Sequence, residues 1–148
     1  MTREEFEVYL SHFNNKRYGA ATAYFAPDVT LEFCTTPGGD PGEARTLHGA
    51  QAFIEQYKSL HANVHEVVEL RDFIPGEELI AAEMYTEFHA LNDAPDFARR
   101  PLRKGESMVM TNWVIYNLEH GKMKRIRIAH FRMHDPKSAK YAPESWGK

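Results

Sequence analysis

The second half of the chain contains four long strand-like runs in succession, and no other feature limits the fold as strongly. The runs combine apolar–polar alternation with many β-branched and aromatic residues, which is typical of strands with one buried face. Pro75-Gly76 separates the first two runs and Gly121 the last two, as expected of tight turns. Neighbouring strands joined by such turns pair antiparallel, so a long antiparallel sheet is predicted. The runs cover residues 63–73, 78–91, 107–119 and 122–134.

The first third of the chain has helical spacing instead. Thr2 begins a capping box, and apolar residues follow at intervals of three and four up to Phe13. A second, short helix is expected to stop at Pro27, a strand to cover residues 29–36, and a third helix to cover residues 49–61. The stripe expected to be buried on the second helix is Tyr18, Ala21, Tyr24 and Phe25.

Three helices and one strand, followed by four antiparallel strands, predict an α+β fold. A long sheet can curve over the three N-terminal helices as a half-barrel, which gives a cone whose interior is a pocket for a small molecule. A single domain of residues 1–148 is expected, because this length builds one core and no linker divides it. The tail from about residue 135 shows no period.

Charge and composition argue against several functions. The net charge of −3 is too acidic for a domain whose main partner is a nucleic acid. No apolar stretch approaches the ~18 residues needed to cross a membrane. Cys34 is the only cysteine, so neither an internal disulfide nor a cysteine-rich metal site is expected. The first segment is charged and unlike a signal peptide, so a cytoplasmic protein is expected.

Three segments resemble the nuclear-transport-factor-2-like superfamily. NNKRYGAATAYFAPDVTLEF resembles its helix–helix–strand opening, TLHGAQAFIEQY its third helix, and VIYNLEHGKMKRIRIAHF its last hairpin. The chain is most similar to the SnoaL-like cyclases and isomerases of secondary metabolism, with ketosteroid isomerase and scytalone dehydratase as cousins. The resemblance covers roughly Thr2 to His134 and implies the cone, but this fold hosts many unrelated chemistries.

The resemblance also implies which side chains face the interior of the cone. The position of the catalytic Asp of ketosteroid isomerase is occupied by Phe33, and that of its catalytic Tyr by Leu10, next to Tyr9. We therefore expect this chain to share the cavity of ketosteroid isomerase but not its catalytic mechanism. The implied inner faces are Val64, Glu66, Val68, Leu70 and Asp72, then Ile80, Ala82, Met84, Thr86 and Phe88, then Val109, Thr111, Trp113 and Ile115, then Ile126, Ile128, His130 and Arg132.

His130 and Glu66 are the predicted catalytic residues. His130 continues an inward aliphatic series and titrates near neutral pH, so it can give or take a proton, although a core histidine bonded to a backbone carbonyl is the alternative. Glu66 interrupts an apolar series with a carboxylate, which is costly to bury unless it is paired or protonated. A β-bulge that turns Glu66 outward, or an ion pair with Arg132, would remove it from the chemistry.

The remaining candidates are substrate-binding residues. Trp113 and Tyr57 would form flat walls for a ring system, although both also suit a plain core. Arg132 would hold an enolate or carboxylate oxygen, and Asp72 would lie near the pocket rim unless it is a solvated turn acid. The rest of the predicted lining is Met84, Phe88, Phe33 and Thr111.

No metal or cofactor is expected. His61/His65 and His130/His134 have a tempting spacing, but four residues of a strand span ~13 Å, too far for two imidazoles to share one zinc ion. The sequence lacks a nucleophile elbow and a phosphate-binding glycine loop.

These residues predict a cofactor-free acid/base enzyme. It would isomerise, cyclise, open or dehydrate a hydrophobic polyketide- or terpenoid-like intermediate. The alternatives are a non-catalytic dimeric ligand-binding protein and an epoxide hydrolase, for which only Arg132 with Asp72 approaches the required acid–arginine–acid set. A homodimer through the outer sheet face is also expected, since members of the similar family pair there and the outward face of the last strands is predicted to carry Met110, Val114, Tyr116, Ala129 and Phe131.

Overall fold

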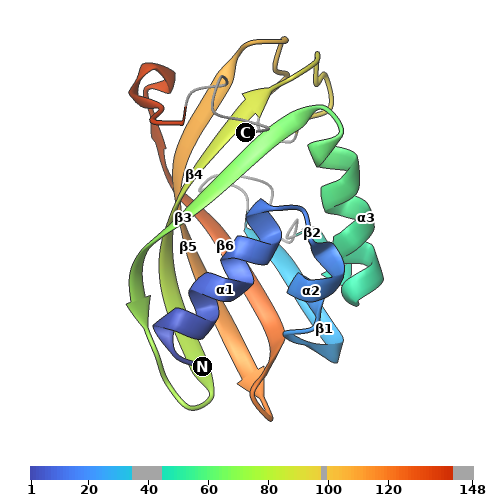
Figure 1. Cartoon of the computed structure of the whole chain (residues 1–148), viewed down its shortest axis with the longest axis vertical. Coiled ribbons are helices and arrows are strands. Elements are labelled where there is room, and N and C mark those ends of the chain that lie inside the picture. The colour runs from blue at the N-terminus through green and yellow to red at the C-terminus, as the bar shows by residue number, and fades with distance from the viewer. Residues whose placement is uncertain (35–44, 98–99, 142–148) are drawn as a thin grey trace.

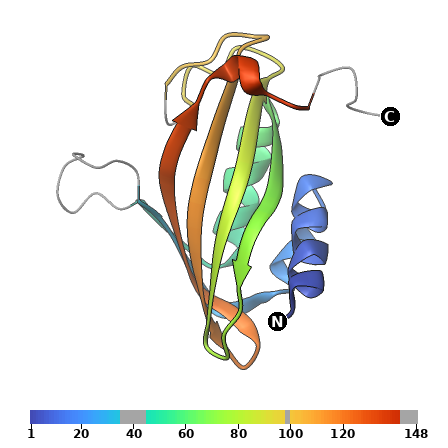
Figure 2. The ribbon, with the colours of Figure 1, turned by 90° about the vertical axis from the view of Figure 1, so that its left-hand side faces the viewer.

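A single curved sheet, open at its edges, carries three helices on its concave side (Figures 1 and 2). The computed structural model describes residues 1–34, 45–97 and 100–141. The predicted α+β half-barrel is confirmed. The elements are α1 (Arg3–Asn14), α2 (Tyr18–Thr22), β1 (Phe25–Cys34), β2 (Arg45–His48), α3 (Ala50–His61), β3 (Val64–Ile74), β4 (Leu79–Ala90), β5 (Ser107–Glu119), β6 (Lys122–His134) and a 3₁₀ turn (Pro136–Ser138).

The sheet is mixed, and not wholly antiparallel as predicted. Its strand order is β2-β1-β6-β5-β4-β3. Strands β3 to β6 form the expected antiparallel meander, while β1 lies parallel to β6 and β2 pairs antiparallel with β1. The parallel pair brings the first strand of the chain beside the last, so residues from both ends build one wall.

The N-terminal elements follow the local signals, with one correction. In the capping box, the Glu5 N–H donates to Thr2 Oγ1 (3.1 Å) and the Thr2 N–H donates to Glu5 Oε2 (2.8 Å). Helix α2 ends at Thr22, so Phe25 is buried from a strand and not from a helix as predicted. Pro27 lies where the pairing of β1 with β6 is irregular, between Phe25 and Thr30, which is where a strand tolerates proline.

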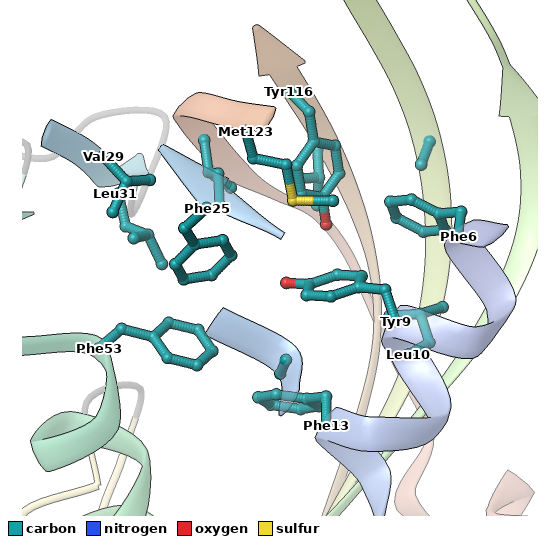
Figure 3. Packing of buried hydrophobic residues seen from close by; sticks show 14 of the residues in the cluster. Phe6, Tyr9, Leu10, Phe13, Phe25, Val29, Leu31, Phe53, Tyr116 and Met123 are labelled. Atoms are coloured by element: carbon teal, nitrogen blue, oxygen red, sulfur yellow. The ribbon is translucent and has the colours of Figure 1, made fainter. Parts of the chain in front are cut away.

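The main core lies between α1, α3 and the sheet and is dominated by aromatic rings (Figure 3). Phe6 is fully buried and packs edge-on against Tyr116 of β5, with ring centroids 5.2 Å apart. Phe53 of α3 meets Phe25 of β1 in a T-shaped contact at 5.0 Å. A smaller apolar cluster closes the far end of the sheet; its buried members are Val64, Phe88, Ala94, Ala90, Leu102, Met108 and Met110.

The segment after β6 folds back over the outer face of the sheet. It covers Glu87 of β4, which is fully buried and accepts from the backbone N–H groups of Lys140 (2.7 Å) and Tyr141 (3.2 Å). The Tyr85 hydroxyl (2.5 Å) and His89 Nε2 (2.7 Å) also bind this carboxylate. The polar face predicted for β4 is therefore present but covered. Residues 35–44, which include the end of the strand predicted at 29–36, and the tail from 142 lie outside the described residues.

Candidate functional site

A cavity of about 420 Å³ lies between the concave face of the sheet and helices α1 and α3. Its wall is mostly aliphatic and aromatic, and a few polar groups converge on it from β3, β4, β5 and β6. The volume falls in the range of small-molecule sites, which are mostly apolar with a few placed polar groups.

Three tyrosines on different elements form part of the cavity wall: Tyr9 of α1, Tyr57 of α3 and Tyr116 of β5. Burial is the main cause that raises the pKa of each of them. The Tyr9 and Tyr116 rings meet edge-on, with centroids 6.4 Å apart, and Figure 3 shows both hydroxyl oxygens turned toward the same space. These hydroxyls therefore remain protonated at neutral pH and supply neutral polar groups to an otherwise apolar region.

His130 reaches the cavity from β6 and is held by two neighbouring strands. Its Nδ1 lies 2.7 Å from Oδ1 of Asn112, directly across the β5–β6 pair, and 3.2 Å from the sulfur of Met110. The Asn112 amide in turn donates to Oγ1 of Thr86 on β4 (3.2 Å). That bond turns Oδ1 toward His130, so Nδ1 carries the ring proton in the neutral imidazole. Nε2, which has no hydrogen-bond partner among the described residues, is left to a ligand.

Glu66 reaches the cavity from β3, and a histidine holds it from behind. Oε1 of Glu66 lies 3.1 Å from Nε2 of His61, the last residue of α3, and Nδ1 of His61 lies 2.6 Å from the Tyr18 hydroxyl of α2. All three side chains are buried, with 6 to 8% of each residue exposed. Oε2 of Glu66 makes no hydrogen bond within the described part of the chain.

A cation lies at another part of the wall. Arg45, at the start of β2, is hydrogen-bonded to the side chain of Gln56 on α3, and its guanidinium lies 5.8 Å from the centroid of the Phe33 ring. All three residues line the cavity. Because Arg45 is exposed, it places a positive charge where this part of the wall reaches the surface.

Six of the ten predicted site residues line this cavity. His130 and Glu66 do so, as do four of the predicted binding residues: Tyr57, Met84, Phe88 and Phe33. Neither proposed reason to dismiss Glu66 holds, because Glu66 points inward and pairs with His61, not with Arg132. Their positions in one cavity satisfy the geometric requirement of the predicted chemistry; their roles remain predictions.

The predicted inner face of β5 is wrong. Trp113 is 47% exposed on the outer face, where it stacks on Phe131 (centroids 3.8 Å apart) and donates to Glu83 (2.8 Å). Thr111 also faces outward and is bonded to His134. β5 is apolar on both faces, so alternation alone could not choose between them. The residues expected outside, Met110, Val114 and Tyr116, are buried in the interior.

Two β-bulges turn the other predicted residues outward. In β6, His130 pairs with Asn112 but Arg132 pairs with Thr111, so the pairing skips Phe131 and Arg132 becomes exposed. In β3, the pairing with β4 shifts between Leu70 and Phe73, and Asp72 is exposed. Neither Arg132 nor Asp72 lines the cavity.

Sequence reasoning missed four of the polar groups that support the site as partners. The sequence places Thr86 on the inner face but suggests no role for it. Asn112 is missed because the predicted inner face of β5 is the wrong one. His61 was considered only as a metal ligand, and Tyr18 only as part of a buried stripe. The one local signal for this contact is that His61 ends the apolar face of a helix only five residues before Glu66.

Two further searches bear on function. Within the described ranges, no group of three or more His, Cys, Asp or Glu side chains is arranged to hold a metal ion. Among the same residues, no helix is both long and apolar enough to cross a membrane.

Comparison with known proteins agrees with this architecture. The profile of the SnoaL-like domain matches residues 6–126. No curated protein sequence matches significantly.

Solved structures share the fold at low sequence identity. A protein described as a polyketide cyclase from Xanthomonas campestris superposes with a TM-score of 0.65 at 18% identity, covering 85% of this chain and 87% of that one. A SnoaL-like polyketide cyclase from Agrobacterium tumefaciens gives 0.62 at 15%, covering 83% and 85%. An LEH-like epoxide hydrolase from M. tuberculosis gives 0.60 at 10%, covering 85% and 79%.

Proposed function

The chain belongs to the SnoaL-like domain family, and from that premise we propose that it is a cofactor-free acid/base enzyme. It would isomerise, cyclise or dehydrate a hydrophobic, ring-containing intermediate of the polyketide or terpenoid kind in secondary metabolism. One observation carries the proposal: Glu66 and His130 lie in the wall of a single apolar cavity, and each is oriented by its own hydrogen-bonded partner. Titratable groups held in this way suit general acid–base catalysis.

The two groups divide the work of moving a proton. One removes a proton from the bound substrate, and the other delivers a proton to a second position, or to a leaving hydroxyl in a dehydration. No hydrogen bond joins Glu66 to His130 among the described residues. They belong to separate hydrogen-bond networks and lie at different levels along β4. His130 pairs with Asn112, whose partner on β4 is Met84, whereas the partner of Glu66 on β4 is Phe88. A substrate that spans the cavity would be needed to connect them.

The residues predicted for epoxide hydrolysis do not line the cavity. This reaction was expected to use Arg132 with Asp72, and both are exposed outside the cavity. The non-catalytic alternative uses the same cavity and is separated from the enzyme by experiment.

The test is proton exchange with solvent. Cyclic 1,3-diketones and hydroxylated anthrones would be incubated with the protein in D₂O, and loss of C–H signal would be followed by ¹H NMR. His130→Ala and Glu66→Gln should each slow exchange by ~10²-fold. Arg132→Ala, on the same strand as His130 but on the outer face, is the matched control and should exchange like the parent protein.

The outcomes separate the two classes. Ligands that bind, seen as line broadening, but exchange no faster than in buffer would support a binding protein. Exchange that survives both cavity substitutions would contradict the assigned residues.

A further inference from the structure

A chain of three buried side chains ends at the cavity wall, and its members come from three elements. Tyr18 (α2), His61 (α3) and Glu66 (β3) are joined by contacts of 2.6 and 3.1 Å. The imidazole of His61 is fixed in place by aromatic rings: it stacks on Tyr18 (5.8 Å between centroids) and meets Phe13 (5.6 Å) and Tyr57 (5.7 Å). A ring packed in this way has one orientation, so its two nitrogens keep separate partners.

The tyrosine at the far end sets the direction of every hydrogen bond in the chain. Burial, with a smaller contribution from the charge of Glu66, raises the pKa of Tyr18, so its hydroxyl keeps its proton. His61 is the only hydrogen-bond partner of that hydroxyl among the described residues. Donation to Nδ1 is the arrangement that satisfies this O–H, and it requires Nδ1 to be unprotonated. The ring proton then lies on Nε2, which donates to Oε1 of Glu66.

We propose that Tyr18 and His61 are positioning residues that hold Glu66 as an ionised general base, with Oε2 turned to the cavity, for a substrate that is a carbon acid. A donor at Oε1 stabilises the carboxylate and fixes its plane. An ionised carboxylate accepts a proton and has none to give, so Glu66 acts in the proton-removing step.

This inference rests on the proposed function for its biological substrate. It narrows the substrate to an apolar molecule with a C–H bond beside a carbonyl group. The proton passes from the substrate carbon to Oε2, and the electron pair of the C–H bond is taken up by the carbonyl oxygen as an enolate. The tyrosine hydroxyls of the wall are neutral hydrogen-bond donors available to such an oxygen.

The tautomer can be measured without any substrate. In protein labelled with ¹⁵N-histidine, two-bond ¹H–¹⁵N correlations at pH 7.5 should show His61 neutral and protonated at Nε2. Tyr18→Phe should shift the Nδ1 resonance, because its hydrogen bond is lost, while His130 should be unaffected. A His61 that is protonated at Nδ1, or that is an imidazolium, would overturn the proposal.

The base can be measured with a probe of known chemistry. In 5-nitrobenzisoxazole, removal of the C3 proton breaks the N–O bond, the electron pair forms a nitrile, and coloured 2-cyano-4-nitrophenolate leaves. The parent protein should accelerate this elimination over buffer, and Glu66→Gln should reduce kcat/KM by ~10²-fold. Tyr18→Phe and His61→Gln should lose several-fold in kcat with little change in KM, because both preserve the cavity surface. Arg132→Ala should be unchanged.

Each result decides something. No acceleration by the parent protein, or full activity in Glu66→Gln, refutes the base. Full activity in both Tyr18→Phe and His61→Gln, with folding verified by circular dichroism, refutes the positioning role. If the diketone panel shows no exchange while the NMR and probe results hold, the proposed function fails and the ionised Glu66 stands.

Discussion

Replacing Glu87 by Gln should destabilise the protein strongly although Glu87 lies outside the cavity. The carboxylate is fully buried and accepts four hydrogen bonds: Oε2 from the Tyr85 hydroxyl and the Lys140 N–H, and Oε1 from His89 and the Tyr141 N–H. An amide has one oxygen, so its NH₂ group must face two donors and two bonds are lost. At about 1.5 to 3 kcal/mol for each bond to a charged group, the cost is about 3 to 6 kcal/mol.

A urea titration measures this directly. With a slope of about 2 kcal/mol per molar urea, a loss of about 4 kcal/mol lowers the midpoint by about 2 M. Hydrogen exchange at residues 139–141 should rise at the same time, since their backbone donors lose their acceptor. Glu83→Gln is the matched control: Glu83 lies on the same face of β4, its side chain bonds the exposed Trp113 and no other described residue, and the change should cost less than about 1 kcal/mol. The reasoning is refuted if Glu87→Gln unfolds at the parent midpoint.

The pH dependence of Glu87 has a definite sign. Burial alone would raise its pKa, but the bonds from Tyr85, the Lys140 backbone, His89 and the Tyr141 backbone together lower it. A folded-state pKa below the unfolded value gives stability that is present at neutral pH and lost as the pH falls through the folded-state pKa. Glu87→Gln should therefore show a shallower loss of stability in acid than the parent protein.

Further substitutions test other parts of the structure. Burial, followed by the charges of nearby Lys and His side chains, lowers the pKa of His65 to about 4, so the urea midpoint should fall between about pH 6.5 and 4 and fall less in His65→Gln. Phe6→Ala should cost about 3 to 5 kcal/mol by calorimetry, because the ring is fully buried against other rings, and a loss under about 1 kcal/mol would contradict the packing. Gly121→Ala should cost about 1 kcal/mol in thermal unfolding, since φ is +76° in the β5–β6 turn. If the exposed Trp113–Phe131 stack is a dimer contact, sedimentation should show a dimer that Trp113→Asp dissociates, and a parent monomer at tens of micromolar would exclude it.

Local sequence signals predicted the elements well, because turns, caps and alternation act over a few residues. The runs predicted at 107–119 and 122–134 coincide with β5 and β6, and the capping box at Thr2 is present. Glu66 and His130 were correctly assigned inward, because each precedes the bulge in its strand. From Val64 in β3 and from Ile126 in β6, the parity of the face holds up to that point.

The errors have a common physical cause: where apolar–polar alternation does not determine which face of a strand points inward, the pairing within the sheet does. The face of β5 is set by its pairing on both sides, since Met108 and Met110 are as apolar as Val109 and Trp113. A bulge inserts one residue and exchanges the two faces beyond it, which reversed Arg132. The His61–Tyr18 contact joins residues 43 positions apart, and only the packing of α2 against α3 brings them together.

The parallel pairing of β1 with β6 also determines when the protein can fold during synthesis. Thr30 pairs with Arg125, so β1 and β2 have no other strand to join until residues 122–134 exist. Before then they can form at most a two-stranded ribbon, which is only marginally stable in water. Contacts so distant in sequence make folding slow. Helix α1 can already pack on β3 and β5 through Phe73 and Tyr116, but the wall built by β1 and β2 joins the sheet only when the last strand emerges, and chaperones have until then to bind these two strands.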